Sequence, residues 1–301
     1  MEEIEPIETL RQALTLFVHV GMPARNLSAR TRTEYTNDLT DLITYLQQQG
    51  IVPLARVTLQ HLTGYQAEMD KCGYQPSTRS RKTHAIKSWF RFLYDQGVIT
   101  DNVASRLVPP RAVKPEPRFL SEAEYQRLLR ACSHHPRDAA IIELFLQTGM
   151  RLSELARLTL GDLELPAKIT RDPDNMGTVH ITRKGGKVDT IPLNYKACQS
   201  LTAWLKARPR VEHDALFVTK FSTPMGKRAI QQVVQKYMEE VGLQNASVHT
   251  LRHTMATHHI ARGTDAKTIQ ETLGHASLTT TTIYISLAKK AQRKALQEHA
   301  L

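Results

Sequence analysis

The sequence of 301 residues is poor in cysteine and lacks any long apolar run. Its three cysteines, Cys72, Cys132 and Cys198, are odd in number and widely spaced, which argues against a disulfide framework and is typical of a reducing compartment. No apolar run approaches the ~20 residues of a transmembrane helix. Residues 1–5 also lack the basic and apolar regions of a signal peptide. We therefore expect a cytosolic protein that has no membrane partner.

Acidic residues are relatively few. Lysine and arginine number 40 against 29 aspartates and glutamates, so the formal net charge is +11. This surplus favours a polyanionic partner, and nucleic acid is the first candidate, because a membrane-surface protein would need a basic amphipathic helix or a lipidation motif. There are 13 histidines, but no Cys-x-x-Cys pair or His-Glu-x-x-His motif accompanies them. We expect neither a metal nor another cofactor.

Prolines gather at one place in the chain. Four of the 14 lie between Pro109 and Pro117, where they exclude helix and favour a semi-rigid linker. We assign the linker to residues 109–118. It separates an N-terminal unit, residues 1–108, from a C-terminal unit, residues 119–287, and both are of ordinary domain size. Residues 288–301 form a basic tail with a narrow apolar face, too short to fold alone.

The N-terminal unit is predicted to be helical. Apolar residues recur at helical spacing from Leu10 to Val18 and from Tyr35 to Leu46, the latter after a predicted Ser28 cap. Two more helices are expected at residues 58–71 and from residue 76 onward. The pattern predicts a four-helix unit.

The C-terminal unit is predicted to be mainly α with a small β-hairpin. Ser121 and Glu124 match a capping box, and a buried helix over residues 141–146 should stop at Gly149. Residues 179–182 and 190–193 flank the turn 183–187, whose two glycines supply the positive φ angles of a tight hairpin. Residues 165–176, ahead of the hairpin, resemble an insertion, and we assign no chemistry to them.

The last fifth of the chain holds the most informative motif. The run His249-Thr250-Leu251-Arg252-His253 is followed by Leu273-Gly274-His275 and, nine residues after that histidine, by Tyr284. Arg151 and Glu154 lie upstream, one helical turn apart. Breaking a phosphodiester requires that its charge be neutralised, its phosphorus attacked and its leaving oxygen protonated. The planar fork of arginine can bond two phosphate oxygens, and tyrosine can attack once a base removes its proton.

These residue types suggest one role each. Arg151 and Arg252 would clamp the phosphate, and Glu154 would orient Arg151. Tyr284 would attack phosphorus, so that the bond energy is kept in a phosphotyrosine. His249 would accept or return the proton of the tyrosine. His275 would hydrogen-bond the phosphate or help position the tyrosine, whereas His253 is interpreted as a packing or hydrogen-bonding residue behind Arg252.

With these motifs the chain resembles the tyrosine recombinases, the family of the phage integrases. The likeness covers the second half residue by residue and the first half more loosely. It implies a C-shaped clamp of two domains, a SAM-like four-helix core-binding domain and a tyrosine recombinase catalytic domain. It also implies that a lysine of the hairpin turn protonates the leaving 5′-oxygen. Lys184 has the family's position, Lys187 is the alternative, and Arg183 stands where the family often has glycine.

The resemblance also bears on DNA contacts. Basic residues of the fourth predicted helix occur with no acid among them, and the downstream catalytic signature favours contact with DNA over a merely solvated face. The expected DNA-binding residues are Arg79, Arg81, Lys82, Lys87 and Arg91 in that helix, with Arg183 and Lys187 in the hairpin turn.

The implied activity is site-specific recombination. Each subunit would cleave one strand of duplex DNA through a 3′-phosphotyrosine, and strand exchange would pass through a Holliday junction. The implied partners are double-stranded DNA with paired inverted half-sites and a homo-tetramer, with a paralogous recombinase as a further candidate subunit and no small-molecule substrate. The basic tail is implied to dock on a neighbouring subunit.

Two alternatives share parts of this pattern. One is a type IB topoisomerase-like nicking-closing enzyme, and the other is a catalytically inactive DNA-binding regulator on the same scaffold. The helical first unit, the Gly274-His275-Ala276-Ser277 motif and the tail favour a recombinase, and the filled catalytic positions argue against an inactive regulator. The core-binding helices begin near residue 10, so we expect no arm-binding domain ahead of them. This favours a compact Xer-like, Cre-like or transposon-encoded member, acting in integration, excision, or dimer or cointegrate resolution.

Overall fold

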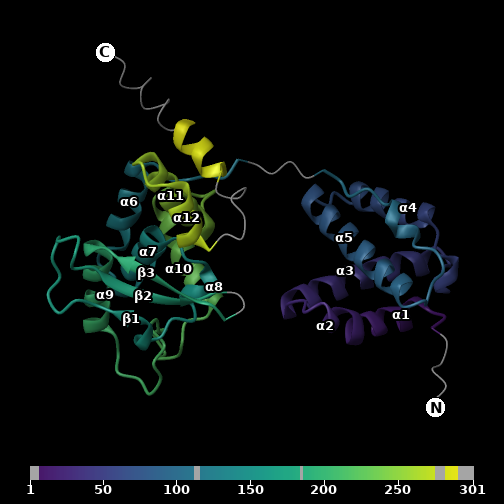
Figure 1. The fold of residues 1–301 in the computed structure, drawn as a ribbon, viewed down its shortest axis with the longest axis horizontal. Coiled ribbons are helices and arrows are strands. Elements are labelled where there is room, and N and C mark those ends of the chain that lie inside the picture. The colour runs from purple at the N-terminus through teal and green to yellow at the C-terminus, as the bar shows by residue number, and fades with distance from the viewer. Residues whose placement is uncertain (1–6, 112–115, 184–185, 275–281, 291–301) are drawn as a thin grey trace. The chain divides into compact units, whose positions relative to one another are not determined.

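The chain divides into two compact units, residues 1–115 and 116–301 (Figure 1). The computed structural model describes residues 7–111, 116–183, 186–274 and 282–290. The division falls within the proline-rich segment, and each unit has its own hydrophobic core. Among the described residues, no helix is both long and apolar enough to cross a membrane.

The first unit is helical, as predicted. Its elements are α1 (Leu10–Leu16), a π-helical turn (Phe17–Gly21), α2 (Met22–Ala24), α3 (Ala29–Gln48), α4 (Leu59–Lys71) and α5 (Pro76–Asp95), with 3-10 turns at Leu54–Arg56 and Val103–Arg106. The Ser28 side chain accepts a hydrogen bond from the Thr31 amide and caps α3, which confirms the predicted cap. Trp89 of α5 is fully buried, and its ring N–H donates to the Ala13 carbonyl at 3.2 Å. This bond ties α5 to α1.

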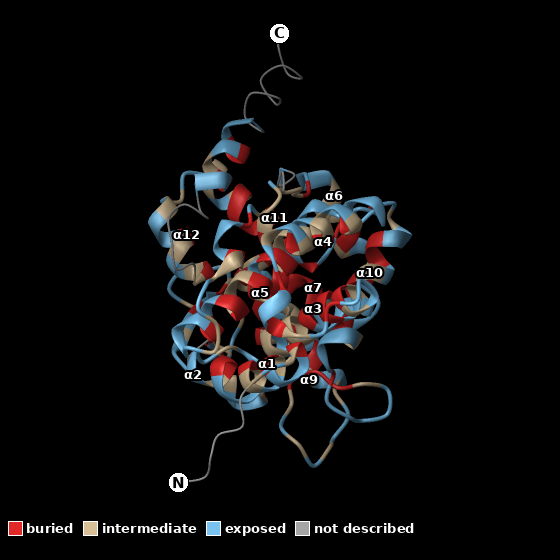
Figure 2. Cartoon of the chain, turned by 90° about the vertical axis from the view of Figure 1, so that its right-hand side faces the viewer, coloured by how far each residue is buried: buried red, intermediate tan, exposed pale blue. Residues whose placement is uncertain are grey.

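The second unit is mainly helical with one small sheet. Its helices are α6 (Glu122–Cys132), α7 (Pro136–Thr148), α8 (Leu152–Leu155), α9 (Tyr195–Ala207), α10 (Lys227–Glu240), α11 (Val248–Ala261) and α12 (Ala266–Leu273), and residues 282–290 are also helical. A 3-10 turn lies at Leu160–Asp162. Six apolar residues of α7 are buried, so this helix is central to the core (Figure 2). The predicted capping box of Ser121 and Glu124 is present at the start of α6.

The sheet has three antiparallel strands in the order β1 (Leu163–Glu164), β2 (Gly177–Thr182) and β3 (Val188–Leu193). The pairs Gly177–Leu193 and Thr182–Val188 bound the β2–β3 register, which confirms the predicted hairpin. The short strand β1 was not predicted, because two residues are too few to show a strand pattern. Between β1 and β2, residues 165–176 form a loop in which the Asn175 side chain donates to the Lys168 carbonyl at 2.7 Å.

Candidate active site

The end of α7 places the first arginine. Gly149 ends α7 as predicted, with a left-handed φ of 59°. A Cβ atom added there would lie 2.5 Å from Met255 Cε and 2.7 Å from Leu273 Cδ2, so the position requires glycine for space as well as for φ. Two residues later, Arg151 stands at the N-cap of α8. The left-handed turn therefore brings Arg151 close to α11 and α12.

Arg151 and Glu154 form the predicted pair. Nη1 of Arg151 lies 2.9 Å from Oε1 of Glu154, and the Arg151 amide donates to Oε2 at 2.6 Å. Burial would raise the pKa of the Glu154 carboxyl, but these bonds and the charge of Arg183 outweigh burial and hold the pKa below its usual value. Glu154 is thus an anion that fixes both the backbone and the side chain of Arg151.

Arg252 is held from two sides. It is 5% exposed on α11, and its Nη1 and Nη2 donate to the carbonyls of Gly149 at 2.5 Å and Leu273 at 2.7 Å. Burial, and then the nearby charge of Arg151, lower the pKa of Arg252 to about 10. The guanidinium therefore keeps its charge at neutral pH and lies beside the first arginine, as a two-arginine phosphate site requires.

Tyr284 faces the same place from the helix 282–290. It is 2% exposed, and its hydroxyl oxygen lies 3.0 Å from Nδ1 of His253. Burial raises the pKa of the Tyr284 hydroxyl, while the charge of Arg252 and a hydrogen bond with it act in the opposite direction. Arg252 is therefore close enough to stabilise a tyrosine oxyanion.

His253 is neutral at physiological pH. Burial first, and then the charges of His249 and Arg252, lower its pKa to about 4. Its ring packs on the Tyr284 ring with centroids 5.6 Å apart. The sequence suggested a packing or hydrogen-bonding residue behind Arg252, and the structure shows that its hydrogen-bond partner is the hydroxyl of the candidate nucleophile. The spacing of four residues between His249 and His253, one helical turn, could have signalled that the two side chains lie on the same face of α11.

Of the other residues predicted for catalysis, the structure describes His249 and Lys187. His249 lies at the start of α11 with an exposed side chain, one turn before His253. Lys184 and His275 lie outside the described residues. Lys187, the alternative to Lys184, is 78% exposed, and its ammonium lies 2.9 Å from Oδ1 of Asp189. In the part of the chain that is described, no group of three or more His, Cys, Asp or Glu side chains is arranged to hold a metal ion.

Arg183 was expected to contact DNA, but its side chain is buried within the protein. It is 7% exposed, and its guanidinium pairs with Glu154 at 3.0 Å and with Asp189 at 3.0 Å. It also donates to the Thr272 carbonyl at 2.6 Å, at the end of α12. The sequence could not show this burial, because the partners come from three separate segments.

The basic residues of α5 also have partners that the sequence order did not reveal. Arg79 pairs with Asp70 of α4 at 2.5 Å, and Arg81 pairs with Asp38 of α3. Lys82 is 4% exposed and pairs with Asp38 at 3.1 Å and Asp41 at 2.6 Å. The Lys87 ammonium donates to the carbonyls of Ser105 and Leu107, both at 2.7 Å. Arg91 is 74% exposed, with Asp95 at 3.7 Å. The run lacks acids of its own, but neighbouring helices supply them.

A basic surface on α10 was missed. Its exposed and half-buried polar side chains fall on one face, since Ile230, Val234 and Tyr237 occupy the buried face. Arginine and glutamine are the side chains that read guanine and adenine in the major groove. The sequence signal for this surface is the recurrence of basic and glutamine side chains every three to four residues along α10. The residues are Lys227, Arg228, Gln231, Gln232, Gln235 and Lys236.

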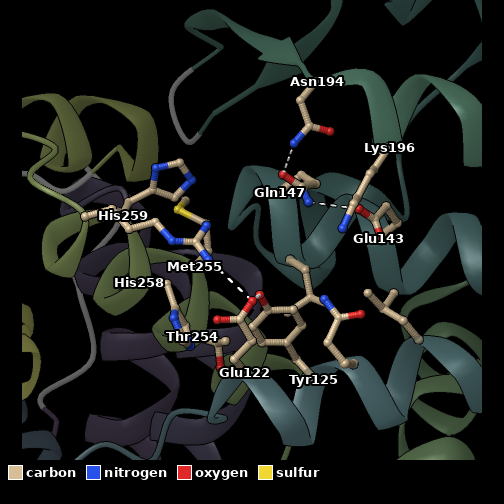
Figure 3. A pocket seen from close by; sticks show the side chains of 14 residues that line it. Glu122, Tyr125, Glu143, Gln147, Asn194, Lys196, Thr254, Met255, His258 and His259 are labelled. Atoms are coloured by element: carbon tan, nitrogen blue, oxygen red, sulfur yellow. Dashed lines mark hydrogen bonds and ion pairs between the residues drawn. The ribbon is translucent and has the colours of Figure 1, made fainter. Parts of the chain in front are cut away.

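A pocket of about 290 Å³ lies between α6, α7 and α11 (Figure 3). Leu129, Leu146 and Met255 line part of it. Glu143 is 4% exposed there and accepts a hydrogen bond from Gln147 at 2.8 Å, and burial raises the pKa of its carboxyl. The pocket is thus of mixed character, with an apolar part, a buried acid and the basic side chains of Lys196 and Arg262 in its wall.

Comparisons with known proteins agree with this geometry. Residues 118–291 match the phage integrase family, and residues 14–97 match the phage integrase N-terminal SAM-like domain. The chain is 34% identical over 289 residues to tyrosine recombinase XerC of Natranaerobius thermophilus, covering 91% of this chain and 94% of that protein. It is 33% identical over 285 residues to tyrosine recombinase XerD of Bifidobacterium longum, covering 89% of each.

Solved structures show the same fold. The XerH recombinase bound to its difH substrate, in a post-cleavage complex, superposes with a TM-score of 0.74 at 22% identity, covering 94% of this chain and 83% of that one. A lambda integrase tetramer bound to a Holliday junction superposes with a TM-score of 0.71 at 17% identity, covering 92% and 77%.

Proposed function

The chain belongs to the phage integrase family and is a tyrosine site-specific recombinase, and from this premise we propose that Tyr284 is its nucleophile. The observation that carries this proposal is the convergence of Tyr284 and Arg151 on Arg252, whose charge acts on the tyrosine hydroxyl. The phenolic oxygen attacks phosphorus, the bond from phosphorus to the 5′-oxygen breaks, and a 3′-phosphotyrosine remains. Because one ester replaces another, no external energy source is needed.

Arg151 and Arg252 bind the two non-bridging oxygens in this proposal. The backbone carbonyls of Gly149, Leu273 and Gly274 hold the two guanidinium groups before DNA arrives. Such preorganisation strengthens charge stabilisation in the transition state, because little has to move when charge develops on the phosphate. His275 would add a further hydrogen bond to the phosphate.

The two histidines of α11 have different roles toward the tyrosine hydroxyl. His253 holds the hydroxyl in the DNA-free protein. His249 accepts the proton when the tyrosine attacks, since its exposed position at the helix start allows it to reach bound DNA. Lys184 gives a proton to the departing 5′-oxygen, with Lys187 as the alternative donor.

Double-stranded DNA with inverted half-sites is the proposed substrate, bound in the cytosol by a tetramer of this chain or of this chain and a paralogue. The basic face of α10 would read bases, and Arg91 of α5 would contact the backbone. Because Lys82 and Arg183 are buried among acids, we propose structural roles for both instead of DNA contact.

The pocket between α6, α7 and α11 is our proposed acceptor for the tail of a neighbouring subunit. The apolar part of its wall, formed by Leu129, Leu146 and Met255, suits the stripe of Ala291, Ala295 and Leu296. A leucine side chain fits within such a volume. Residues 291–301 themselves lie outside the described residues.

Trapping of the covalent intermediate tests the proposal. A duplex with a nick close to the cleavage position lets a short fragment diffuse away, so the wild-type protein should accumulate a protein–DNA adduct that maps to the peptide containing Tyr284. The Tyr284→Phe variant should bind the same duplex and form no adduct. An adduct in the Phe variant, or one that maps to another tyrosine, would overturn the assignment.

A plasmid assay separates the recombinase from a type IB topoisomerase-like enzyme, which uses the same chemistry. Relaxation of a supercoiled plasmid that carries no recombination site would favour the topoisomerase-like enzyme. Recombination between two sites, with no relaxation of site-free plasmid, favours the recombinase.

A further inference from the structure

We infer that Arg183 is a positioning residue that locks the hairpin turn onto the arginine clamp. The inference rests on the proposed function, in which the residue that follows Arg183 in the sequence supplies the leaving-group proton. Arg183 is the first residue after β2, and its amide donates to the Lys187 carbonyl at 2.7 Å, while its own carbonyl accepts from the Gly186 amide at 3.2 Å. The backbone of Arg183 therefore closes the turn.

The side chain of Arg183 then joins this turn to two other elements. Nε pairs with Oδ2 of Asp189 on β3 at 3.0 Å, so the base of the hairpin is bridged from strand to strand. Nη2 donates to the Thr272 carbonyl at 2.6 Å, and Nη1 donates more weakly to the Leu273 carbonyl at 3.4 Å. The hairpin is thus fixed against the C-terminal end of α12, where the partial negative charge of the helix favours a cation.

Glu154 links Arg183 to the clamp. Nη1 of Arg183 lies 3.0 Å from Oε2 of Glu154, whose other oxygen accepts from Arg151 at 2.9 Å. One buried carboxylate is therefore shared by the clamp arginine and by the turn arginine. A shift of either guanidinium changes the electrostatic environment of the other through this common anion.

Close packing leaves Arg183 little freedom. Gly274 has a left-handed φ of 61°, and a Cβ atom there would lie 3.1 Å from Nε and 3.2 Å from Cζ of Arg183. The carbonyl of the same glycine accepts from Nη2 of Arg151 at 3.1 Å. The guanidinium of Arg183 thus lies against the backbone of the segment that leads to His275.

Burial separates this role from DNA contact. Arg183 is 7% exposed, and its five-donor guanidinium is occupied by two carboxylates and two carbonyls. Arg157 provides the contrast, since it is exposed and donates to the Thr182 carbonyl of the same strand at 3.2 Å without reaching Glu154 or α12 through any hydrogen bond that the described residues make. Arg157 is therefore a matched control for removal of an arginine beside the hairpin.

The test compares cleavage of ordinary DNA with cleavage of DNA whose 5′ leaving oxygen is replaced by sulfur, which leaves with little need of a proton. Arg183→Ala should cut ordinary DNA about 100-fold more slowly, the loss typical of a catalytic group displaced by about 1 Å. It should regain most of that rate on the sulfur substrate, and Arg157→Ala should cut both substrates like the wild type. A wild-type rate for Arg183→Ala on ordinary DNA would overturn the inference, as would an equal loss on both substrates.

Hydrogen exchange provides a second readout that does not depend on which residue is the acid. Arg183→Ala should exchange faster at the amides of residues 186–187 and 272–274 and keep wild-type protection in α7. Exchange that is faster throughout the second unit would show a general loss of stability and would count against a positioning role. If Lys184→Ala is not rescued by sulfur, the assignment of the acid fails, while the exchange pattern still decides the role of Arg183.

Discussion

The hydroxyl oxygen of Tyr284 and Nδ1 of His253 lie 3.0 Å apart, between the helix 282–290 and α11. Both side chains are largely withdrawn from water, which raises the pKa of the tyrosine and lowers that of the histidine. Each is thereby kept in its neutral form. The nucleophile is therefore stored as a phenol in the DNA-free protein and must be activated by substrate.

The low pKa of His253 predicts how stability depends on pH. Its folded pKa is about 4, below the ordinary value of 6.5, so the unfolded chain takes up the proton first as pH falls. The free energy of unfolding should therefore decrease as pH falls from 6.5 to about 4, and the contribution is lost below that pH. Urea titrations across this range should show a smaller decrease for His253→Gln than for the wild type. Parallel curves would contradict the neutral, buried histidine.

Arg151→Lys should lower the rate of cleavage strongly while leaving DNA binding almost unchanged. The lysine keeps the charge but cannot bond Glu154, Gly274 and a phosphate oxygen at once, since it lacks the planar fork. We expect the cleavage rate to fall by at least about 100-fold, a figure comparable to the loss of one oxyanion donor, with a dissociation constant close to that of the wild type. Arg157→Lys serves as the control. Near-normal recombination by Arg151→Lys would show that this residue does not bind the phosphate.

Cleavage should persist in excess EDTA. Each task that a metal could perform on the phosphate has a side chain assigned to it, and the charge of Arg252 acts on the tyrosine. The measurement is adduct formation on the nicked duplex with and without chelator. Complete loss of the adduct, restored by magnesium or zinc, would require a metal in the mechanism.

DNA affinity should fall steeply with salt. About six phosphate contacts would give a slope near −5 in log K against log salt. If the face of α10 lies on DNA, Lys227→Ala should reduce the slope by about 1. Lys206→Ala, an exposed lysine on α9, should leave the slope unchanged. The same reduction in both variants would argue against a specific role for α10.

Removal of the tail should damage assembly and spare the fold. Leu287 and Ala288 are each 3% exposed, and Lys290 pairs with Glu116 at 2.5 Å, so the truncation should begin at residue 291 and not at 288. The truncated protein should bind one half-site normally and lose cooperative filling of a full site, as gel shifts on one-site and two-site DNA would show. Gln126→Trp, which fills the proposed acceptor pocket, should reproduce this loss. Unchanged cooperativity would mean that the tail packs on its own subunit.

Local signals in the sequence predicted the elements and the Arg151–Glu154 pair, because caps, glycine stops and one-turn spacing act within a few residues. Contacts between distant segments were not predictable in this way. The acids that pair with Lys82 lie about 40 residues upstream on α3, and the partners of Arg183 come from α8, β3 and α12. The sequence indicated that His253 packs or forms a hydrogen bond, but the partner, Tyr284, is 31 residues away and could not be identified from local spacing. A basic residue in sequence is thus a weak guide to an exposed charge.

Gly149 and Gly274 end two helices in the left-handed conformation, and their carbonyls hold the two clamp arginines. Neither glycine has a side chain to offer to DNA, yet a replacement at either position would adopt a strained φ, would meet Met255 and Leu273 at Gly149, and would press on Arg183 at Gly274. A random-mutagenesis screen for recombination should therefore find few tolerated substitutions at either position, and fewer at Gly149 than at Gly274. In related genes that are no longer under selection for recombination, loss of either glycine would indicate an inactive enzyme.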